Sequence, residues 1–151
     1  MKQNLSAVTL LQTILKGLLG GAQMHFIHAQ LNEQRGFSKL SKRMLEEYEE
    51  EMASAAQIMA HITRLGGEIK HEVSTFEIYT SIEEQIRQEA KLQAIAVEGL
   101  EEMIKSTTLD LATENYLNEY FDGEVEHNTW LQQQVALIDT IGIQNYLTTQ
   151  L

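Results

Sequence analysis

The stretch LATENYLNEYFDGEVEHNTWLQQQVALIDTI, residues 111–141, decides the class of fold. Its apolar residues recur at spacings of three and four with no proline between them, which predicts one long amphipathic helix. Two polar residues, Glu124 and His127, interrupt the apolar stripe near the middle of this helix. Because residues three apart project from the same side of a helix, both side chains are predicted to point into the protein.

The rest of the chain carries the same periodicity, so we expect an all-α protein. Ser38 is predicted to be the N-cap of the second helix, and Ser81 with Glu84 forms a capping box before the third. The predicted helices span about residues 5–34, 38–65, 81–105 and 111–141, and a short tail helix spans about residues 143–149.

The lengths of the connections predict how the helices are arranged. The first and third connections are short, so each joins two antiparallel neighbours. The second connection, residues 66–80, is long enough to run the length of a bundle and leave the second and third helices parallel. The sequence therefore predicts a ferritin-like four-helix bundle with one long crossover between helices two and three, followed by a short C-terminal fifth helix.

Polar residues interrupt the inward stripes of the other helices too. His25 lies on the stripe of the first helix, where we expect a hydrogen-bonded core histidine. Glu51 and Gln93 lie on the stripes of the second and third helices. A carboxylate in a core is costly unless it is paired, hydrogen-bonded or bound to metal, so several facing polar groups suggest a metal site.

These positions match part of the pattern of di-iron carboxylate bundles. In that pattern two helices each supply one Glu, and the other two each supply Glu-x-x-His. The fourth helix carries the motif whole, at Glu124 and His127, whereas the second carries Glu51 followed by Ser54 in the place of His. The corresponding positions on the first and third helices hold Leu18 and Gln93.

The composition excludes several other classes of function. The absence of cysteine removes disulfides, thiolate zinc sites and iron–sulfur clusters. A formal net charge of −11 repels nucleic acid and anionic membranes, so neither is expected as a partner, and it attracts cations. No apolar stretch is long enough for a transmembrane helix and the N-terminus lacks a signal-peptide pattern, so we expect a cytoplasmic protein.

Three segments carry a resemblance to a known family. They are His25-Phe26-Ile27-His28-Ala29, the run from Glu124 to Leu131 (EVEHNTWL), and Gly142-Ile143-Gln144-Asn145-Tyr146-Leu147. With them the chain resembles bacterioferritin over nearly its whole length, which implies one ferritin-like domain at residues 1–151. The resemblance also implies a hollow shell of roughly two dozen subunits that stores ferric mineral, built from bundles of this type.

Carried over residue by residue, the resemblance implies that half of the iron ligands are kept. The retained positions are Glu51, Glu124 and His127, and the positions that lack a good ligand are Leu18, Ser54 and Gln93. Two irons need enough anionic oxygen ligands to offset their charge, so the di-iron ferroxidase site is expected to be lost. Two interpretations remain for the three retained residues: they hold a single ion weakly, or they form a hydrogen-bonded cluster without metal.

The resemblance also implies a haem b shared between two subunits. Met52 matches the family's haem ligand, and one Met from each of two subunits would bind the iron. Glu49 lies on the same helix face, where an apolar residue would suit a porphyrin better. The residues expected to line the haem pocket are Leu19, Gln23, Phe26, Leu45, Ala56 and Met59.

The expected function is a haem-binding subunit of an iron-storage shell without ferroxidase activity of its own. Its partners would be like subunits, unlike subunits with a complete ferroxidase site, ferrous and ferric iron, and an electron-donor protein. Two alternatives are a weak ferroxidase that uses Glu51, Glu124 and His127, and a haem-free structural shell subunit. The acidic residues Glu46, Glu47 and Glu50 fit either a solvated helix face or the inner wall of a shell.

Overall fold

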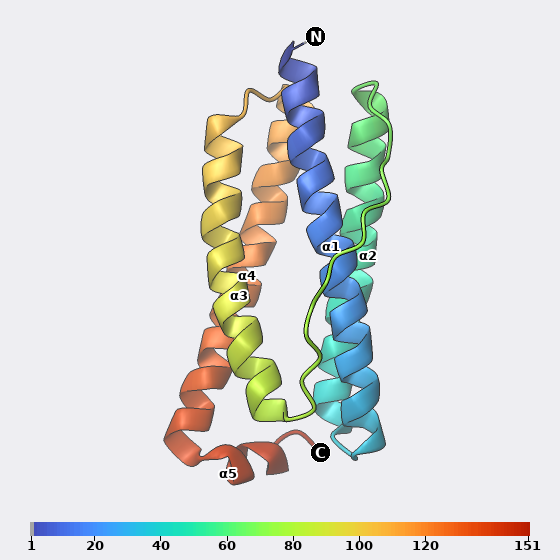
Figure 1. Ribbon diagram of the computed structural model, residues 1–151. Helices are drawn as coiled ribbons and strands as arrows, with labels where there is room; N and C mark the ends of the chain where they lie inside the picture. The colour runs from blue at the N-terminus through green and yellow to red at the C-terminus, as the bar shows by residue number, and fades with distance from the viewer. Residues whose placement is uncertain (1) are drawn as a thin grey trace.

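The computed structural model describes residues 2–151, with side chains from residue 7 onward. Its four long helices form an elongated bundle, and a short fifth helix lies at one end (Figure 1). The elements are α1 (Lys2–Gln34), α2 (Ser38–Arg64), α3 (Ile82–Ser106), α4 (Leu111–Ile141) and α5 (Ile143–Thr148). The predicted all-α, ferritin-like bundle is confirmed. No helix in the described residues has a stretch that is long and apolar enough to cross a membrane.

Side-chain caps mark the starts of α3 and α4, whereas α2 and α5 begin without one. The predicted capping box is present, because Ser81 Oγ accepts a hydrogen bond from the Glu84 backbone N–H at 3.3 Å. The prediction for Ser38 was wrong: Ser38 is already the first residue of α2, and its N-cap is Phe37. The Lys39 backbone N–H in this first turn donates instead to the carbonyl of Gln150, so the C-terminal tail takes the role of the cap.

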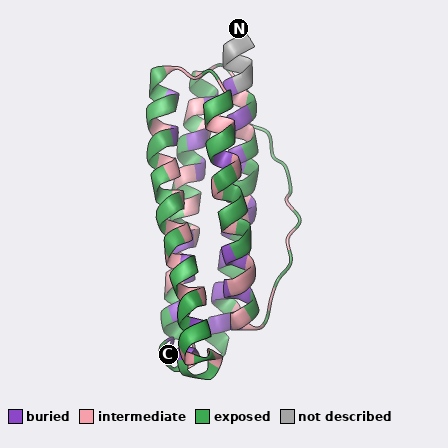
Figure 2. Ribbon diagram, turned by 90° about the vertical axis from the view of Figure 1, so that its left-hand side faces the viewer, coloured by how far each residue is buried: buried purple, intermediate pink, exposed green. Residues whose placement is uncertain are grey.

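The long crossover between α2 and α3 runs beside α1, as Figures 1 and 2 show. Ser74 Oγ donates to the Lys16 carbonyl at 3.2 Å, and further along the Tyr79 backbone N–H donates to His28 Nε2 at 3.1 Å. The crossover therefore follows α1 in the same direction and returns the chain to the end of the bundle where α2 began. Because of this return, α3 runs parallel to α2, as the length of the connection predicted.

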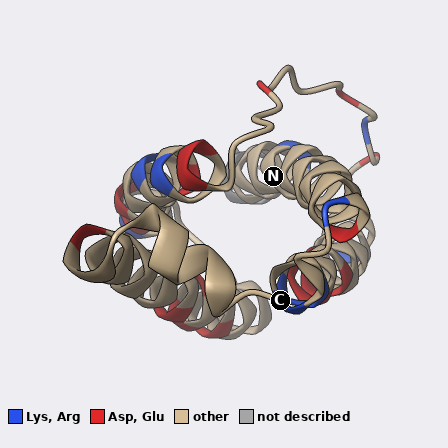
Figure 3. Cartoon of the chain, turned by 90° about the horizontal axis from the view of Figure 1, so that it is seen from below, with Lys and Arg blue, Asp and Glu red and all other residues tan. Residues whose placement is uncertain are grey.

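Helix α5 lies across one end of the bundle, as Figure 3 shows from that end. Gly142 breaks the helix between α4 and α5 with a φ of 82°, a conformation that favours glycine. The side chain of Tyr146 is fully buried, and its hydroxyl donates to Gln134 Oε1 at 2.8 Å. This tyrosine attaches α5 to the core.

The apolar core is divided into two clusters along the bundle axis. The cluster far from α5 consists of Leu10, Leu11, Ile14, Leu15, Leu18, Ala55, Ile58, Ile62, Leu100 and Leu117. The cluster near α5 consists of Ala29, Leu40, Met44, Ile82, Ile86, Ile138 and Tyr146. Between these two sets, each of α1, α2, α3 and α4 carries polar residues of the predicted stripes.

Candidate functional site

A layer of polar side chains lies at mid-height in the bundle, between the two apolar clusters. Each member continues the inward spacing of its own helix, so the same periodicity that buries Leu and Ile above and below also turns these residues inward. The layer contains His25 from α1, Glu47 and Glu51 from α2, Glu89 and Gln93 from α3, and Glu124 and His127 from α4.

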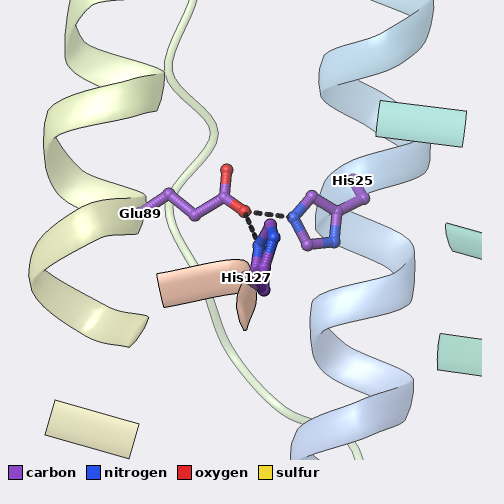
Figure 4. Close-up of side chains that lie close together, drawn as sticks. All are labelled: His25, Glu89 and His127. Carbon is purple, nitrogen blue, oxygen red and sulfur yellow. Dashed lines mark hydrogen bonds and ion pairs between the residues drawn. The ribbon is translucent and has the colours of Figure 1, made fainter. Parts of the chain in front are cut away.

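The carboxylate of Glu89 lies at the centre of this layer, between two histidines (Figure 4). Its Oε1 contacts His25 Nε2 and lies 3.1 Å from His127 Nε2. The other ring nitrogen of His25, Nδ1, contacts Glu51 Oε1. The chain Glu51–His25–Glu89–His127 therefore links all four long helices.

The second nitrogen of His127 also faces a carboxylate. His127 Nδ1 lies 3.1 Å from Glu47 Oε1 in an ion pair, and Arg43 Nη2 lies 2.9 Å from the same oxygen. The ring of Trp130 stacks on His127, and the guanidinium of Arg43 lies 4.5 Å from the centre of the Trp130 ring. Trp130 and Arg43 thus hold both His127 and its carboxylate partner in place.

Glu124, one of the predicted metal ligands, has a different partner. The amide of Gln93 donates to Glu124 Oε2 at 2.8 Å and to the Glu124 backbone carbonyl at 3.1 Å. This contact joins α3 to α4 one turn away from Glu89. The structure thus brings Glu124 together with Gln93, and brings His127 together with Glu89 and Glu47.

Opposite charges dominate the electrostatics at the centre. Burial alone would lower the pKa of His25, but the carboxylates of Glu89 and Glu51 raise it well above its usual value. In the same way Glu47 and Glu89 overcome the effect of burial and raise the pKa of His127 to about 9. The pKa of Glu89 falls far below its usual value, because the two histidines outweigh the cost of burying a carboxylate. The centre is therefore a charged network in the absence of metal.

The other three carboxylates of the layer divide into two kinds. Burial raises the pKa of Glu51 and of Glu124, and their neighbours only partly offset this effect. The pKa of Glu47 is lowered, because its contacts with His127 and Arg43 outweigh burial. Glu51 and Glu124 are thus the more easily protonated carboxylates, and Glu47 and Glu89 carry the negative charge that balances the histidines.

Two members of the layer were given no part in a site by the sequence reasoning. Glu47 was expected to face solvent or a shell interior, but it is buried against His127, one turn before Glu51 on α2. Glu89 continues the inward spacing of Ile82 and Ile86, which placed it on the stripe of the third helix, but it was given no role as a ligand. The expectation that His25 is a hydrogen-bonded core histidine is confirmed.

The three positions without a good ligand lie in different surroundings. Leu18 is buried in the apolar cluster far from α5, with 4% of its side chain exposed. Ser54 is half-buried, and its backbone carbonyl accepts a hydrogen bond from the hydroxyl of Tyr116 at 3.3 Å. Gln93 acts as a donor to Glu124, a role that the glutamate of the family pattern could not take while ionised.

A cavity of about 450 Å³ lies beside the polar layer, between α1 and α3. Small residues on both helices leave this space open, among them Gly17, Gly20 and Gly21 on α1 and Gly99 on α3. Its polar wall is formed by His25, Glu51, Glu89, Gln93 and Glu124. A small ion or water molecule could therefore reach the carboxylates of the layer.

The residues expected around a haem lie on α1 and α2. Met52 and Phe26 are exposed, with 42% and 43% of their side chains accessible. By helical spacing, Leu45, Glu49, Met52, Ala56 and Met59 share one face of α2, and Leu19, Gln23 and Phe26 share one face of α1. Leu19, Leu45 and Met59 are half-buried, whereas Gln23, Glu49 and Ala56 are exposed.

Comparisons with known proteins agree with this geometry. The family model described as a ferritin-like domain matches residues 8–141. Bacterial ferritins of Pseudomonas aeruginosa and of Neisseria meningitidis serogroup B are each 30% identical to this chain, and each alignment covers 100% of both proteins. The bacterioferritin of Streptomyces coelicolor is 24% identical over 99% of this chain and 91% of its own length.

A four-helix bundle with a single long crossover and a central layer of histidines and carboxylates defines the class of the ferritin-like proteins. The chain belongs to the ferritin-like family, as a subunit of its bacterioferritin branch. Members of this family form multisubunit shells that store iron. The resemblance found in the sequence is therefore confirmed.

Proposed function

We propose that this chain is a haem-binding subunit of an iron-storage shell, and that it does not oxidise iron at a di-iron centre of its own. It assembles with a second subunit type that carries a complete ferroxidase site. The observation that carries the proposal is the internal pairing of the polar layer. Each of the carboxylates Glu47, Glu51, Glu89 and Glu124 already has a histidine, arginine or amide partner.

A pair of iron ions needs carboxylates that bridge the metals and balance their charge. At the positions where the resemblance places the missing ligands, Leu18 offers no ligand atom and Gln93 is neutral and donates to Glu124. The remaining carboxylates neutralise two histidines instead of two metal ions. This arrangement supports the loss of the di-iron chemistry.

The cavity supports a second candidate function. Because Glu51 and Glu124 line it, ferrous iron could reach them, and the chain would then be a slow ferroxidase that uses Glu51, Glu124 and His127. Iron oxidation by the purified chain distinguishes the two candidates. Under our proposal the chain shows only background oxidation, and Glu124→Ala leaves that rate unchanged. Oxidation at the rate of an intact di-iron enzyme, lost in Glu124→Ala, would refute the proposal.

The surface around Met52 fits a haem. Met52 is exposed, so a second subunit can reach it, and half-buried Leu19, Leu45 and Met59 supply apolar surface on the same faces of α1 and α2. A haem bound there through two thioethers would carry electrons at a raised potential. Glu49 is exposed and can turn to solvent, so its presence on this face does not block the site.

Haem binding is tested by adding haem to the assembled protein and recording the visible spectrum. We expect a Soret band with about one haem per two chains, as ligation by one Met from each of two subunits requires. Met52→Leu should remove the bound haem. Met103→Leu makes the same substitution on α3, away from the proposed haem residues, and should leave haem binding unchanged. A wild-type protein without a Soret band would instead support the haem-free structural subunit.

Co-assembly is tested on the shell isolated from its native source. Separation of its subunits should show two chain types, and the mixed shell should oxidise ferrous iron faster than shells of this chain alone. A native shell that contains only this chain would contradict the division of labour between subunits.

A further inference from the structure

We propose that His25, Glu89 and His127 form a binding site for one divalent transition-metal ion of the zinc or iron(II) type. The ligand atoms are Nε2 of each histidine and a carboxylate oxygen of Glu89. Two of these three ligands, His25 and Glu89, lie outside the di-iron positions that the sequence resemblance implies. The site depends neither on haem nor on a second subunit type.

The three ligand atoms lie close enough to share one ion. One ligand atom from each residue lies within 4.8 Å of the others, and His127 Nε2 lies 3.1 Å from Glu89 Oε1. An ion with ligand distances of about 2.0–2.2 Å places its ligand atoms roughly 3–4 Å apart. The observed cluster needs little rearrangement to reach that geometry.

The surroundings of the histidines also match those of metal ligands. A ligating histidine usually directs its second ring nitrogen to a carboxylate, which orients the ring and strengthens the ligand. His25 Nδ1 contacts Glu51 in a hydrogen bond, and His127 Nδ1 lies 3.1 Å from Glu47 Oε1 in an ion pair that lacks hydrogen-bond geometry. A neutral imidazole has only one N–H, so a cation at Nε2 lets Nδ1–H serve the outer carboxylate. His25 therefore already has an outer hydrogen-bond partner, and His127 has a carboxylate close to the corresponding nitrogen.

The donor set indicates which ions fit. Two imidazoles and one carboxylate suit zinc or iron(II), whereas calcium and magnesium prefer oxygen ligands alone. The cavity reaches His25 and Glu89, so water can complete the coordination from that side. Zinc should bind more tightly than iron(II) at a given nitrogen and oxygen site, and iron(II) is the ion that an iron-storage shell handles.

The site would join the two halves of the bundle. In the described residues α1 packs mainly on α2 and α3 mainly on α4, and the cavity weakens the packing between α1 and α3. The ligands come from α1, α3 and α4, and the outer carboxylates Glu47 and Glu51 come from α2. One ion would thus connect all four long helices, and its binding should stabilise the folded chain.

The test is a titration of the metal-free chain, without haem or other subunits, with Zn²⁺ and, under anaerobic conditions, with Fe²⁺. Calorimetry should show one ion per chain, and saturating Zn²⁺ should raise the melting temperature by about 5 °C or more. Co²⁺ should give the visible absorption of a low-symmetry nitrogen and oxygen site. His25→Ala, Glu89→Gln and His127→Ala should each weaken Zn²⁺ binding at least tenfold.

His61→Ala is the matched control, because His61 is a half-buried histidine of α2 near the end of the bundle. It should bind Zn²⁺ as the wild type does. Circular dichroism on each variant verifies folding, and Glu89→Gln keeps the size of the side chain if the alanine variants fail to fold. Glu51→Gln should weaken binding by about tenfold as an outer-shell change.

Two results would overturn the proposal. The absence of stoichiometric binding for both Zn²⁺ and Fe²⁺ would mean that the three residues form only a charged hydrogen-bonded network. Binding that is lost in Glu124→Gln but kept in Glu89→Gln would place the ion at the positions of the family pattern instead. Neither result bears on haem binding or co-assembly, so the failure of this inference and that of the proposed function can be told apart.

Discussion

Gly21→Ala should destabilise the protein although alanine is the better helix former. Gly21 lies in the interior of α1, where an added Cβ would overlap Glu51 Oε2. An added methyl group must therefore displace the Glu51 carboxylate, which contacts His25 Nδ1. The matched control is Gly17→Ala one turn earlier on the same helix, because nothing lies within 4 Å of its Cβ position.

The expected magnitudes follow from these contacts. Replacing an interior helical glycine by alanine should stabilise either variant by about 1 kcal/mol. Loss of the charged hydrogen bond between Glu51 and His25 should cost about 1.5–3 kcal/mol. Only Gly21→Ala is expected to lose this bond. Gly17→Ala should thus be more stable than wild type, Gly21→Ala less stable, and their melting temperatures should differ by roughly 3–12 °C.

The assay is thermal unfolding followed by circular dichroism under identical conditions for both variants. A double-mutant cycle isolates the cause: in a Glu51→Ala background the two glycine substitutions should stabilise the chain equally. If Gly21→Ala proved as stable as Gly17→Ala in the wild-type background, the reasoning would be refuted. Glu51 would then not be held against α1 by a contact with His25.

Three further predictions concern the core, a helix cap and α5. Leu117→Ala should cost about 2–5 kcal/mol in urea unfolding because Leu117 is fully buried, and a loss no larger than that of Leu111→Ala, an exposed position, would contradict the core assignment. Asp110→Ala should lower the free energy of unfolding by about 1 kcal/mol, because α4 loses its N-cap. Asp110→Asn, measured alongside, should retain most of the stability of the wild type, because asparagine can also cap the helix. Burial raises the pKa of Tyr146 to about 12, against 10 in the unfolded chain. Ionisation of this tyrosine therefore leaves the free energy of unfolding unchanged below pH 10 and lowers it as the pH rises from 10 to 12, because the unfolded chain ionises first. Tyr146→Phe lacks the hydrogen bond to Gln134 and should be less stable than wild type at neutral pH. The difference in free energy of unfolding between the two proteins should narrow between pH 10 and 12. A difference that stays constant over this range would refute the raised pKa of Tyr146.

The polar layer shows why the site was only partly predictable. Helical spacing predicted that His25, Glu51, Gln93, Glu124 and His127 point inward, and each of them is buried or half-buried. The same spacing could not tell which carboxylate meets which imidazole, because partners on different helices depend on how each helix is shifted and rotated against the others. Whether Glu51, Glu124 and His127 hold an ion stays a prediction.

The buried position of Glu47 shows a second limit. It lies in a run of acidic residues, which favours a solvated helix face, and only the packing of α4 against α2 brings His127 to it. His28 likewise has no partner at helical spacing, and the crossover supplies one in the Tyr79 backbone N–H. In both cases the partner is distant in the sequence and approaches only when the bundle closes.

The sequence alone was sufficient for the properties that depend on near neighbours. Apolar periodicity and capping residues specify the four long helices, and the length of residues 66–80 specifies the parallel direction of α2 and α3, since these effects act within a few turns of chain. Only the tertiary structure decided the pairing of His25 and His127 with Glu89, the cavity between α1 and α3, and the contact of Glu51 with α1. Those features depend on how the helices are shifted and rotated against one another, which no local pattern encodes.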